Sequence, residues 1–353
     1  MPRILPFIII IIAFFGWFVI SNQKEIVEKV SSDTVQVAPD DSITLLFTGD
    51  MMFDRTVRKT LTLRGFDTVF GDSKKIFSGA DMVIANLEGP VTTYPSSLYV
   101  NGVALSGFNF TFPTTTATAL KEHGVDIVNL ANNHTANKGK EGLRQTKEYL
   151  GAANVRYFGD PGNNINETST TTCQDNFCIA LIGWHEFAGT PGNEISIEIQ
   201  RLRAENDIVV VLPHWGVEYK KEPTAGQISL ARLWIDAGAD MVIGTHPHVV
   251  AAIEEYKGKA IFYSLGNFIF DQYFSYDTTH GLVVSVKASK NASSTVSFEY
   301  RLIPMTNVGN VVSSSDATST SRMLQDLVKI STAYVSTSTL LGISKGIFTL
   351  QTK

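Results

Sequence analysis

Short apolar runs alternate with helically patterned stretches along the chain from Ile43 onward. Apolar runs of this length are typical of strands that are buried on both faces of a sheet. Helical spacing with matching start and stop residues predicts helices over residues 114–122, 140–150 and 224–238, the last beginning with a Thr-x-x-Gln capping box. Strands that alternate with helices in this way predict an α/β (α+β) fold.

The later part of the chain has a different pattern. Residues 259–304 predict several strands, with a loop near residues 271–279. Residues 313–320 are rich in Ser and Thr and predict a break, followed by a helix over 321–330 and a weakly specified tail. We therefore expect a folded domain over residues 42–312 and a C-terminal helix and tail over residues 313–353.

The first residues form the most apolar stretch of the chain. No charged residue occurs from Ile4 to Ile20, and Arg3 precedes this stretch. About 17 helical residues span roughly 26 Å, which is at the short end of what crosses a bilayer. We predict a single-pass membrane anchor over residues 1–21 with a cytoplasmic tip and a linker over residues 22–41, which places the domain on the extracytoplasmic side. A cleaved signal peptide is the alternative, and it also implies export.

Composition and charge narrow the class of protein. The 353 residues are 44% hydrophobic and 18% charged, with a formal net charge of −5. Lys and Arg form no basic stripe, so nucleic acid is excluded as a partner. The two cysteines, Cys173 and Cys178, flank a turn-like segment. They either form a disulfide in an oxidising compartment or remain free thiols, and the spacing alone leaves both readings open.

Five apolar strands each end in a residue with a side chain that can bind a ligand. In open α/β sheets, ligands bind at the carboxyl ends of the strands. The most specific of these ends carries two imidazoles split by Pro247, and neutral imidazole is the commonest protein ligand for transition metals. The residues that follow the five strands are Asp50, Glu88, Asn132 to His134, His214, and His246 with His248.

These strand ends predict a metal site. A mixed oxygen and nitrogen ligand set suits Mn, Fe or Zn, and the thiolates of structural zinc sites are missing from it. We expect one divalent transition metal, with two as the alternative. A metal at such a site polarises an ester or acyl oxygen and lowers the pKa of bound water, and His134 would protonate a leaving oxygen. The predicted ligands are Asp50, Glu88, Asn133, His214, His246 and His248.

Six motifs, in order between about residues 45 and 285, carry a family resemblance. They are Gly49-Asp50, Asn86-Leu87-Glu88, Leu130-Ala131-Asn132-Asn133-His134, His214-Trp215-Gly216-Val217-Glu218-Tyr219, Gly244-Thr245-His246-Pro247-His248 and Tyr263-Ser264-Leu265-Gly266-Asn267-Phe268. With these motifs the chain resembles the CapA family of capsule and poly-γ-glutamate synthesis proteins, within the calcineurin-like metallophosphoesterase superfamily.

The resemblance implies a four-layer fold of two mixed β-sheets packed face to face with helices outside. It also implies that Glu88 bridges two metal positions and that His134 is a non-ligating acid. Two departures reduce this set. Met52 stands where the superfamily usually has the histidine of an Asp-x-His motif, and Asn137 stands where CapA proteins commonly have an aspartate near the histidine. We therefore expect one firmly held metal.

The function that this resemblance implies is the making, release or export of an anionic surface polymer, poly-γ-glutamate or capsule. The metal centre would carry out hydrolysis or acyl transfer, and the N-terminal helix could contact membrane subunits of a synthase. A secreted metal-dependent phosphoesterase is one alternative. A non-catalytic scaffold that binds the polymer or assembles a synthase is the other, and Met52 favours it.

Other polar residues have structural interpretations. Asp81, Asp126, Asp207 and Asp240 precede strands and should lie at the opposite end of the sheets, as turn and cap residues. Asn267 is a candidate for the rim of the site, although a Gly-Asn turn explains it almost as well.

Overall fold

The computed structural model describes residues 41–174, 176–291 and 295–351. The predicted membrane anchor and nearly all of the predicted linker lie outside these ranges, so both stay predictions. Within the described ranges, no helix has the length and apolar character needed to span a membrane.

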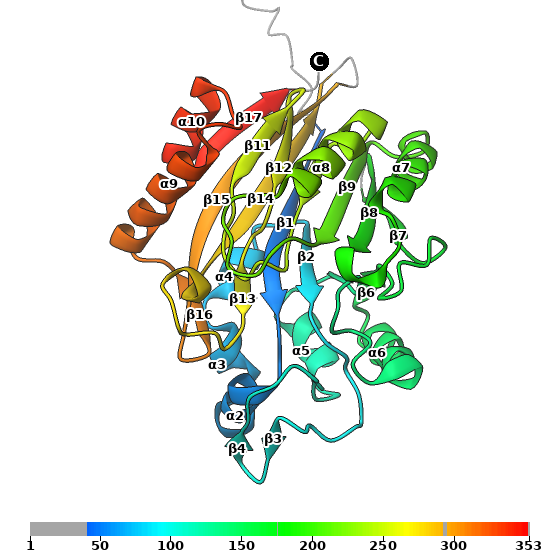
Figure 1. The fold of residues 1–353 in the computed structure, drawn as a ribbon, viewed down its shortest axis with the longest axis vertical. Coiled ribbons are helices and arrows are strands. Elements are labelled where there is room, and N and C mark those ends of the chain that lie inside the picture. Colours follow the sequence, from blue (N-terminus) through cyan, green and yellow to red (C-terminus); the bar gives the residue numbers. More distant parts are fainter. Residues whose placement is uncertain (1–40, 175, 292–294, 352–353) are drawn as a thin grey trace, which may run out of the picture. The chain divides into compact units, whose positions relative to one another are not determined.

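A nine-stranded mixed sheet forms one half of the molecule (Figure 1). Strands β1, β2, β5 and β6 are parallel, whereas β14, β15 and β16 continue the sheet in antiparallel fashion. Strand β13 pairs with β1, and β17 pairs with β15. In spatial order the main path is β16 (Val311–Ser314), β15 (Val296–Val308), β14 (His280–Lys290), β1 (Asp41–Met51), β2 (Met82–Leu87), β5 (Ile127–Asn129) and β6 (Arg156–Phe158), with β13 (Asn267–Ile269) and β17 (Ile347–Gln351) beside it.

A six-stranded mixed sheet forms the other half. Its four central strands β12, β10, β9 and β8 are parallel, and its two edge strands are antiparallel to their neighbours. A small hairpin of β3 (Tyr99–Val100) and β4 (Val103–Ala104) stands apart from both sheets. In spatial order the six strands are β11 (Ile253–Tyr256), β12 (Lys259–Phe262), β10 (Met241–Ile243), β9 (Ile208–His214), β8 (Phe177–His185) and β7 (Ser169–Gln174).

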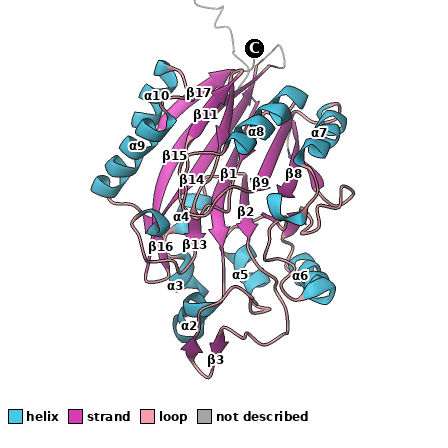
Figure 2. Ribbon diagram, in the orientation of Figure 1, coloured by secondary structure: helices cyan, strands magenta, loops and turns pink. Residues whose placement is uncertain are grey.

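Helices cover the sheets on their outer faces (Figure 2). The nine-stranded sheet is accompanied by α2 (Arg55–Arg64), α3 (Phe66–Phe70), α4 (Ser73–Phe77), α5 (Thr116–Glu122) and α6 (Gly139–Ala152). The six-stranded sheet is accompanied by α7 (Ile195–Arg203) and α8 (Ala225–Ala237). Helices α9 (Ala317–Ser331) and α10 (Thr337–Ser344) pack beside β15, β11 and β17. Short 3-10 turns occupy Glu186–Ala188, Gly192–Glu194 and Asp277–Thr279.

Three apolar clusters define the order of the layers. The central cluster contains Phe47 and Ile84 from one sheet and Val210 from the other, so the two sheets pack face to face. Neighbouring strand residues point the opposite way: Val83 packs with the helices of the first sheet and Val209 with those of the second. Successive side chains alternate between two apolar layers, which explains the unbroken apolar runs and confirms the predicted helix–sheet–sheet–helix arrangement.

The helices predicted over 114–122, 140–150 and 224–238 are confirmed within about two residues, and Thr224 forms the predicted capping box with Gln227. The prediction of a weakly specified tail is wrong. Helix α9 begins at Ala317, helix α10 and strand β17 follow, and Phe348 is buried in the central cluster. Helix α10 has eight residues and β17 five, and in α10 Leu341 is exposed while Thr339 is buried, so the apolar positions of this segment form no clear period.

Four aspartates join the strands at the end opposite the predicted site, as expected. Each precedes one strand, and its carboxylate accepts a hydrogen bond from a backbone N–H of the adjacent strand. The pairs are Asp81 with Thr44, Asp126 with Val83, Asp207 with Cys178, and Asp240 with Val209. The same region holds the β7–β8 hairpin, in which Cys173 and Cys178 face each other and form a disulfide.

Candidate metal centre

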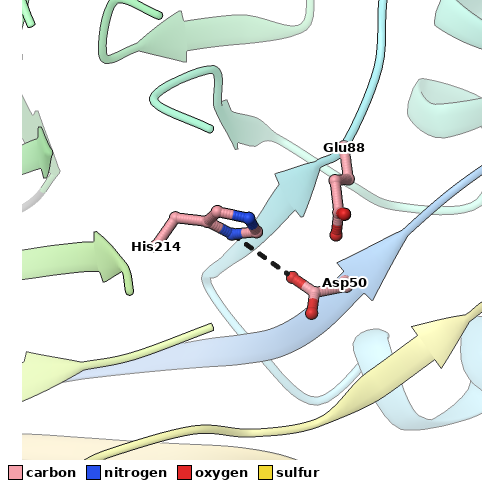
Figure 3. A group of neighbouring side chains, drawn as sticks. All are labelled: Asp50, Glu88 and His214. Atoms are coloured by element: carbon pink, nitrogen blue, oxygen red, sulfur yellow. Dashed lines mark ion pairs between the residues drawn. The ribbon is translucent and has the colours of Figure 1, made fainter. Parts of the chain in front are cut away.

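The carboxyl ends of strands from both sheets converge on one buried cluster. Asp50 lies at the end of β1 and Glu88 just after β2, whereas His214 ends β9 of the six-stranded sheet. All three side chains are fully buried, and one ligand atom of each lies within 4.8 Å of the others. In Figure 3 the two carboxylates and the imidazole ring point toward one another. The predicted convergence of strand ends therefore occurs in the structure.

The loop after β10 brings two further imidazoles to this cluster. His246 and His248 have φ angles of 96° and 59°, values that bulky residues adopt only under constraint. Gly244 allows the turn, because a Cβ at this position would lie 2.2 Å from the carbonyl oxygen of Tyr263. The backbone is therefore strained at His246 and His248. Such strain is common at functional sites.

Hydrogen-bond contacts connect the predicted ligands. The Nε2 atom of His214 lies 2.9 Å from Oδ1 of Asn133 and 3.2 Å from Nδ1 of His246. The Nδ1 atom of His248 lies 3.3 Å from Oδ2 of Asp50. A further contact, from the backbone nitrogen of His246 to Oδ2 of Asp50 at 3.3 Å, joins five of the six predicted ligands, and only Glu88 has no hydrogen bond to them. Their binding of a metal stays a prediction.

Glu88 is the least satisfied group of the cluster. Its side chain is fully buried, and neither carboxylate oxygen has a hydrogen-bond partner among the residues that the structure describes. Nε2 of His248 lies 3.8 Å and Nε2 of His134 3.9 Å from Oε1 of Glu88. Burial, followed by the nearby charge of Asp50, raises the pKa of Glu88 well above its ordinary value. A buried carboxylate without hydrogen bonds is costly unless a proton or a cation neutralises it.

Burial favours the neutral form of three imidazoles in the cluster, those of His134, His214 and His246. Burial, followed by the neighbouring His246, holds the pKa of His214 well below its ordinary value. Burial also lowers the pKa of His246 to about 3 and that of His134 to about 4. Neutral imidazole is the form that binds metal, so few protons compete at neutral pH. Two carboxylates, one amide and three imidazoles fit a divalent transition metal such as Mn, Fe or Zn.

Met52 and Asn137, the two departures from the family pattern, both have defined contacts in the structure. Met52 is fully buried in the cluster beneath the helices of the nine-stranded sheet, and its sulfur lies 3.0 Å from the backbone nitrogen of Asp54. A thioether packed among apolar side chains therefore stands at the motif position where the resemblance implies an imidazole ligand. The side-chain nitrogen of Asn137 lies 3.2 Å from Nδ1 of His134, so an amide takes the place of a carboxylate beside this ring.

Sequence reasoning overlooked one member of the site and left another undecided. The amide nitrogen of Asn86 donates to Oδ1 of Asp50 at 2.7 Å and lies 3.3 Å from Nδ1 of His214. The signal available was an amide at the end of a wholly buried strand. Asn267 belongs to the site rim, because its Oδ1 lies 2.9 Å from Nδ1 of His248. His185, the last residue of β8, contacts the carbonyl oxygen of Pro161 through Nε2 at 2.6 Å.

Fold and site together define an α/β protein with a candidate metal centre between two mixed sheets. Residues 44–272 match the family model described as "Bacterial capsule synthesis protein PGA_cap". Because the match covers more than half of the chain, this protein belongs to that family of bacterial capsule synthesis proteins.

Two curated relatives agree with this family. "PGA biosynthesis protein CapA" of Bacillus subtilis (strain 168) is 34% identical over 263 residues, covering 69% of this chain and 67% of the relative. "Capsule biosynthesis protein CapA" of Bacillus anthracis is 32% identical over 263 residues, covering 68% of this chain and 64% of the relative. The matched region thus spans about two thirds of each relative.

Solved structures show only distant likeness. A novel phosphatase from Mycoplasma pneumoniae has 15% identity and a TM-score of 0.46, covering 78% of this chain and 96% of the phosphatase. A hypothetical protein from Thermus thermophilus has 17% identity and a TM-score of 0.47, covering 74% of this chain and 99% of that protein. These TM-scores are too low to assign a reaction to this chain.

Proposed function

We propose that this chain acts in making, releasing or exporting an anionic surface polymer, poly-γ-glutamate or capsule, and that a metal centre supports hydrolysis or acyl transfer. The family and the printed names of the Bacillus relatives support the polymer. The observation that supports the metal is Glu88, a buried carboxylate whose two oxygens have no hydrogen-bond partner among the described residues.

The ligand set contains donors from both sheets. One Mn, Fe or Zn ion would be held by residues chosen from Asp50, Glu88, Asn133, His214, His246 and His248. When bound, such an ion supplies Lewis-acid chemistry toward an acyl or phosphoryl oxygen. A metallophosphoesterase-like ancestry, implied by the sequence motifs, is part of this proposal.

His134 is the candidate proton donor of the site. The contact of 3.2 Å between the amide nitrogen of Asn137 and Nδ1 favours the tautomer with the ring proton on Nε2, the nitrogen 3.9 Å from Glu88. The ring is packed against Phe110, with centroids 4.5 Å apart, which fixes its orientation. Its pKa of about 4 keeps the ring neutral at pH 7, so it would act by donating this N–H to a developing oxyanion.

The proposed location is the outer side of a membrane, with the N-terminal apolar segment as a single-pass anchor. Export is supported by the disulfide between Cys173 and Cys178, because disulfides persist mainly in oxidising compartments. Labelling of an introduced surface cysteine by a membrane-impermeant reagent in intact cells would test this location.

The deciding experiment measures metal per chain in the full-length protein, purified in detergent without chelator. We expect a stoichiometric transition metal that a His246→Ala, His248→Ala double variant loses and a His123→Gln control retains. The control lies at the end of α5, where His123 contacts Asp67. A folded wild-type chain that takes up none of Mn, Fe or Zn would refute the metal centre and leave the scaffold role.

A further inference from the structure

A cleft of about 370 Å³ opens beside the candidate metal centre. Two buried aromatic rings that contact histidines of the centre also contact Arg55, a residue of the cleft lining. Phe110 lies 4.5 Å from the ring of His134, and Phe270 lies 4.6 Å from the ring of His248. The lining includes Arg55, Phe108, Tyr219, Asp271, Gln272 and Phe274.

Arg55 is the cation of this cleft. Its guanidinium carbon lies 5.1 Å from the ring centre of Phe110 and 5.4 Å from that of Phe270, the same rings that contact the histidines. The guanidinium donates to the carbonyl of Gly107 and to Asp271. Its Nε is buried and has no hydrogen-bond partner among residues 41–174, 176–291 and 295–351. The two terminal nitrogens carry four further N–H groups, and the bonds to Gly107 and Asp271 use two of them, so donors remain for a ligand.

Backbone strain marks the same cleft. Arg55 has a φ of 51° and Tyr219 a φ of 63°. Among the described residues, the other non-glycine positions with positive φ are four asparagines, Lys257, and the two histidines of the centre. Asparagine tolerates this conformation, whereas Arg and Tyr adopt it only when their surroundings enforce it. The fold therefore holds Arg55 and Tyr219 in place with the kind of constraint that it applies to His246 and His248.

Charge and shape select the class of ligand. Asp271 stands beside Arg55, so a singly charged carboxylate would meet about half the repulsion that a doubly charged phosphate would meet. The walls are apolar, with Phe108 and Phe274 exposed by 64% and 65%. Aromatic walls of this kind suit methylene groups next to a carboxylate. A flexible chain with one carboxylate per aliphatic unit fits both properties.

We propose that Arg55 forms a carboxylate-binding subsite that holds one acidic side group of a γ-linked glutamyl chain next to the metal centre. Tyr219, whose ring lies 6.3 Å from that of His248, borders the same path. The subsite rests on the proposed function, since it gives the polymer a point of attachment and places its backbone beside the centre. A purely structural ion pair between Arg55 and Asp271 is the competing explanation.

Binding of a fluorescent γ-linked glutamate pentamer to the full-length protein tests the subsite. We expect Arg55→Gln to weaken binding about tenfold, because it removes a charge-assisted hydrogen bond. Arg64→Gln, an exposed change in the same helix, should leave binding unaltered. A pentamer with carboxamides in place of its side carboxylates should bind the wild-type protein as weakly as the acidic pentamer binds the variant. Equal binding of both pentamers, or displacement by equimolar inorganic phosphate, would overturn the proposal.

Asp271→Asn gives a second result that does not depend on Arg55→Gln folding. It removes the competing carboxylate, so we expect tighter binding of the acidic pentamer. A structural ion pair predicts lower thermal stability and unchanged or weaker binding instead, and that result would refute the subsite. Metal content separates the two proposals. Pentamer binding that depends on Arg55 in a metal-free chain would support the subsite alone, whereas a metal-loaded chain insensitive to Arg55→Gln would support the metal centre alone.

Discussion

Asn86 orients the candidate ligands from both sheets at once. Its amide nitrogen contacts Asp50 and His214, and its carbonyl oxygen accepts from the amide of Asn132 at 3.1 Å. Residues that hold metal ligands in place usually affect affinity nearly as much as the ligands do. We expect Asn86→Ala to weaken metal binding about tenfold to a hundredfold.

Competition with a chromophoric chelator would measure this loss in the full-length protein. Asn166→Ala, a change at an exposed loop position, is the matched control and should bind metal like the wild type. An Asn86→Ala protein with unaltered affinity would show that Asp50 and His214 keep their positions without this amide.

At the scale of single residues, the sequence could identify side chains that follow apolar strands. Asp50, Glu88 and His214 were predictable because each stands where a buried strand ends. Arg55 was not, because it reaches the centre only through Phe110 and Phe270, which are distant in sequence. No local pattern encodes such a contact, which depends on how loops from different strands pack together.

At the scale of elements, the four strand-joining aspartates differ in burial, and this difference predicts their energetic roles. Asp240 is 5% exposed and accepts from Val209 while also pairing with Arg203 and Lys259. Removing it leaves two cations and one N–H without their acceptor. We expect Asp240→Ala to lower the free energy of unfolding by about 2–4 kcal/mol.

The exposed Asp81, which accepts from Thr44, serves as the comparison. Asp81→Ala should cost about 1 kcal/mol, since water replaces most of its interaction. Chemical denaturation of the two variants would test the order, and equal losses would contradict it. Both variants should retain wild-type metal content because they lie at the strand ends opposite the centre.

Glu198 links helix α7 to strand β7 in a pH-dependent way. Hydrogen bonding to Arg201, together with that from Ser169, lowers the pKa of Glu198 below its ordinary value. A carboxyl with a lowered folded-state pKa stabilises the fold above its unfolded pKa of about 4.3, and this contribution disappears as the pH falls through the folded-state pKa. We therefore expect Glu198→Gln to lower the melting temperature at pH 7.

The difference from the wild type should close as the pH falls from 7 to below the lowered folded-state pKa of Glu198, where both side chains are neutral. Melting curves between these pH values would show this convergence. Glu205→Gln, which alters an exposed glutamate just beyond the same helix, should track the wild type throughout. A Glu198→Gln difference that stays constant with pH would indicate lost packing rather than lost charge.

The sequence could predict the helices whose ends carry capping residues. Thr224 and Gln227 form a capping box, and Gly238 closes the same helix in a left-handed conformation. The short helices α3 and α4 have five residues each, too few for a helical period to emerge. Tertiary packing, rather than local propensity, explains why those segments are helical.

At the scale of the whole molecule, the C-terminal segment completes the nine-stranded sheet. Strand β17 pairs with β15, and Ile343, Phe348 and Leu350 are buried in the central cluster. Losing several large buried side chains costs more than the typical stability of a domain, about 5–15 kcal/mol. We expect a chain that ends at residue 335 to be insoluble or unfolded.

Removal of residues 352–353 alone is the matched control and should leave solubility and melting temperature unchanged. Circular dichroism and size-exclusion chromatography in detergent would compare the two truncations. A folded, soluble chain ending at residue 335 would show that the sheet is stable without its added strand.

The candidate ligands come from both sheets, and this has a consequence for the stability of the molecule. Asp50, Glu88 and Asn133 belong to the nine-stranded half, whereas His214, His246 and His248 belong to the six-stranded half. A bound ion would therefore link the two halves of the molecule through its ligands. Ligand at 100 times its dissociation constant adds about 2.7 kcal/mol to stability. The melting temperature should therefore rise with added metal in the wild type and stay constant in the His246→Ala, His248→Ala variant.

With such a link, the fraction of chains that stay folded would depend on the supply of metal. In a metal-poor medium a larger fraction of the chains would open and become accessible to proteases. The number of intact chains would then follow the metal available to them. Under the proposed function, polymer production would decline under metal starvation without any dedicated regulator, because the supply of intact protein would itself respond to the metal.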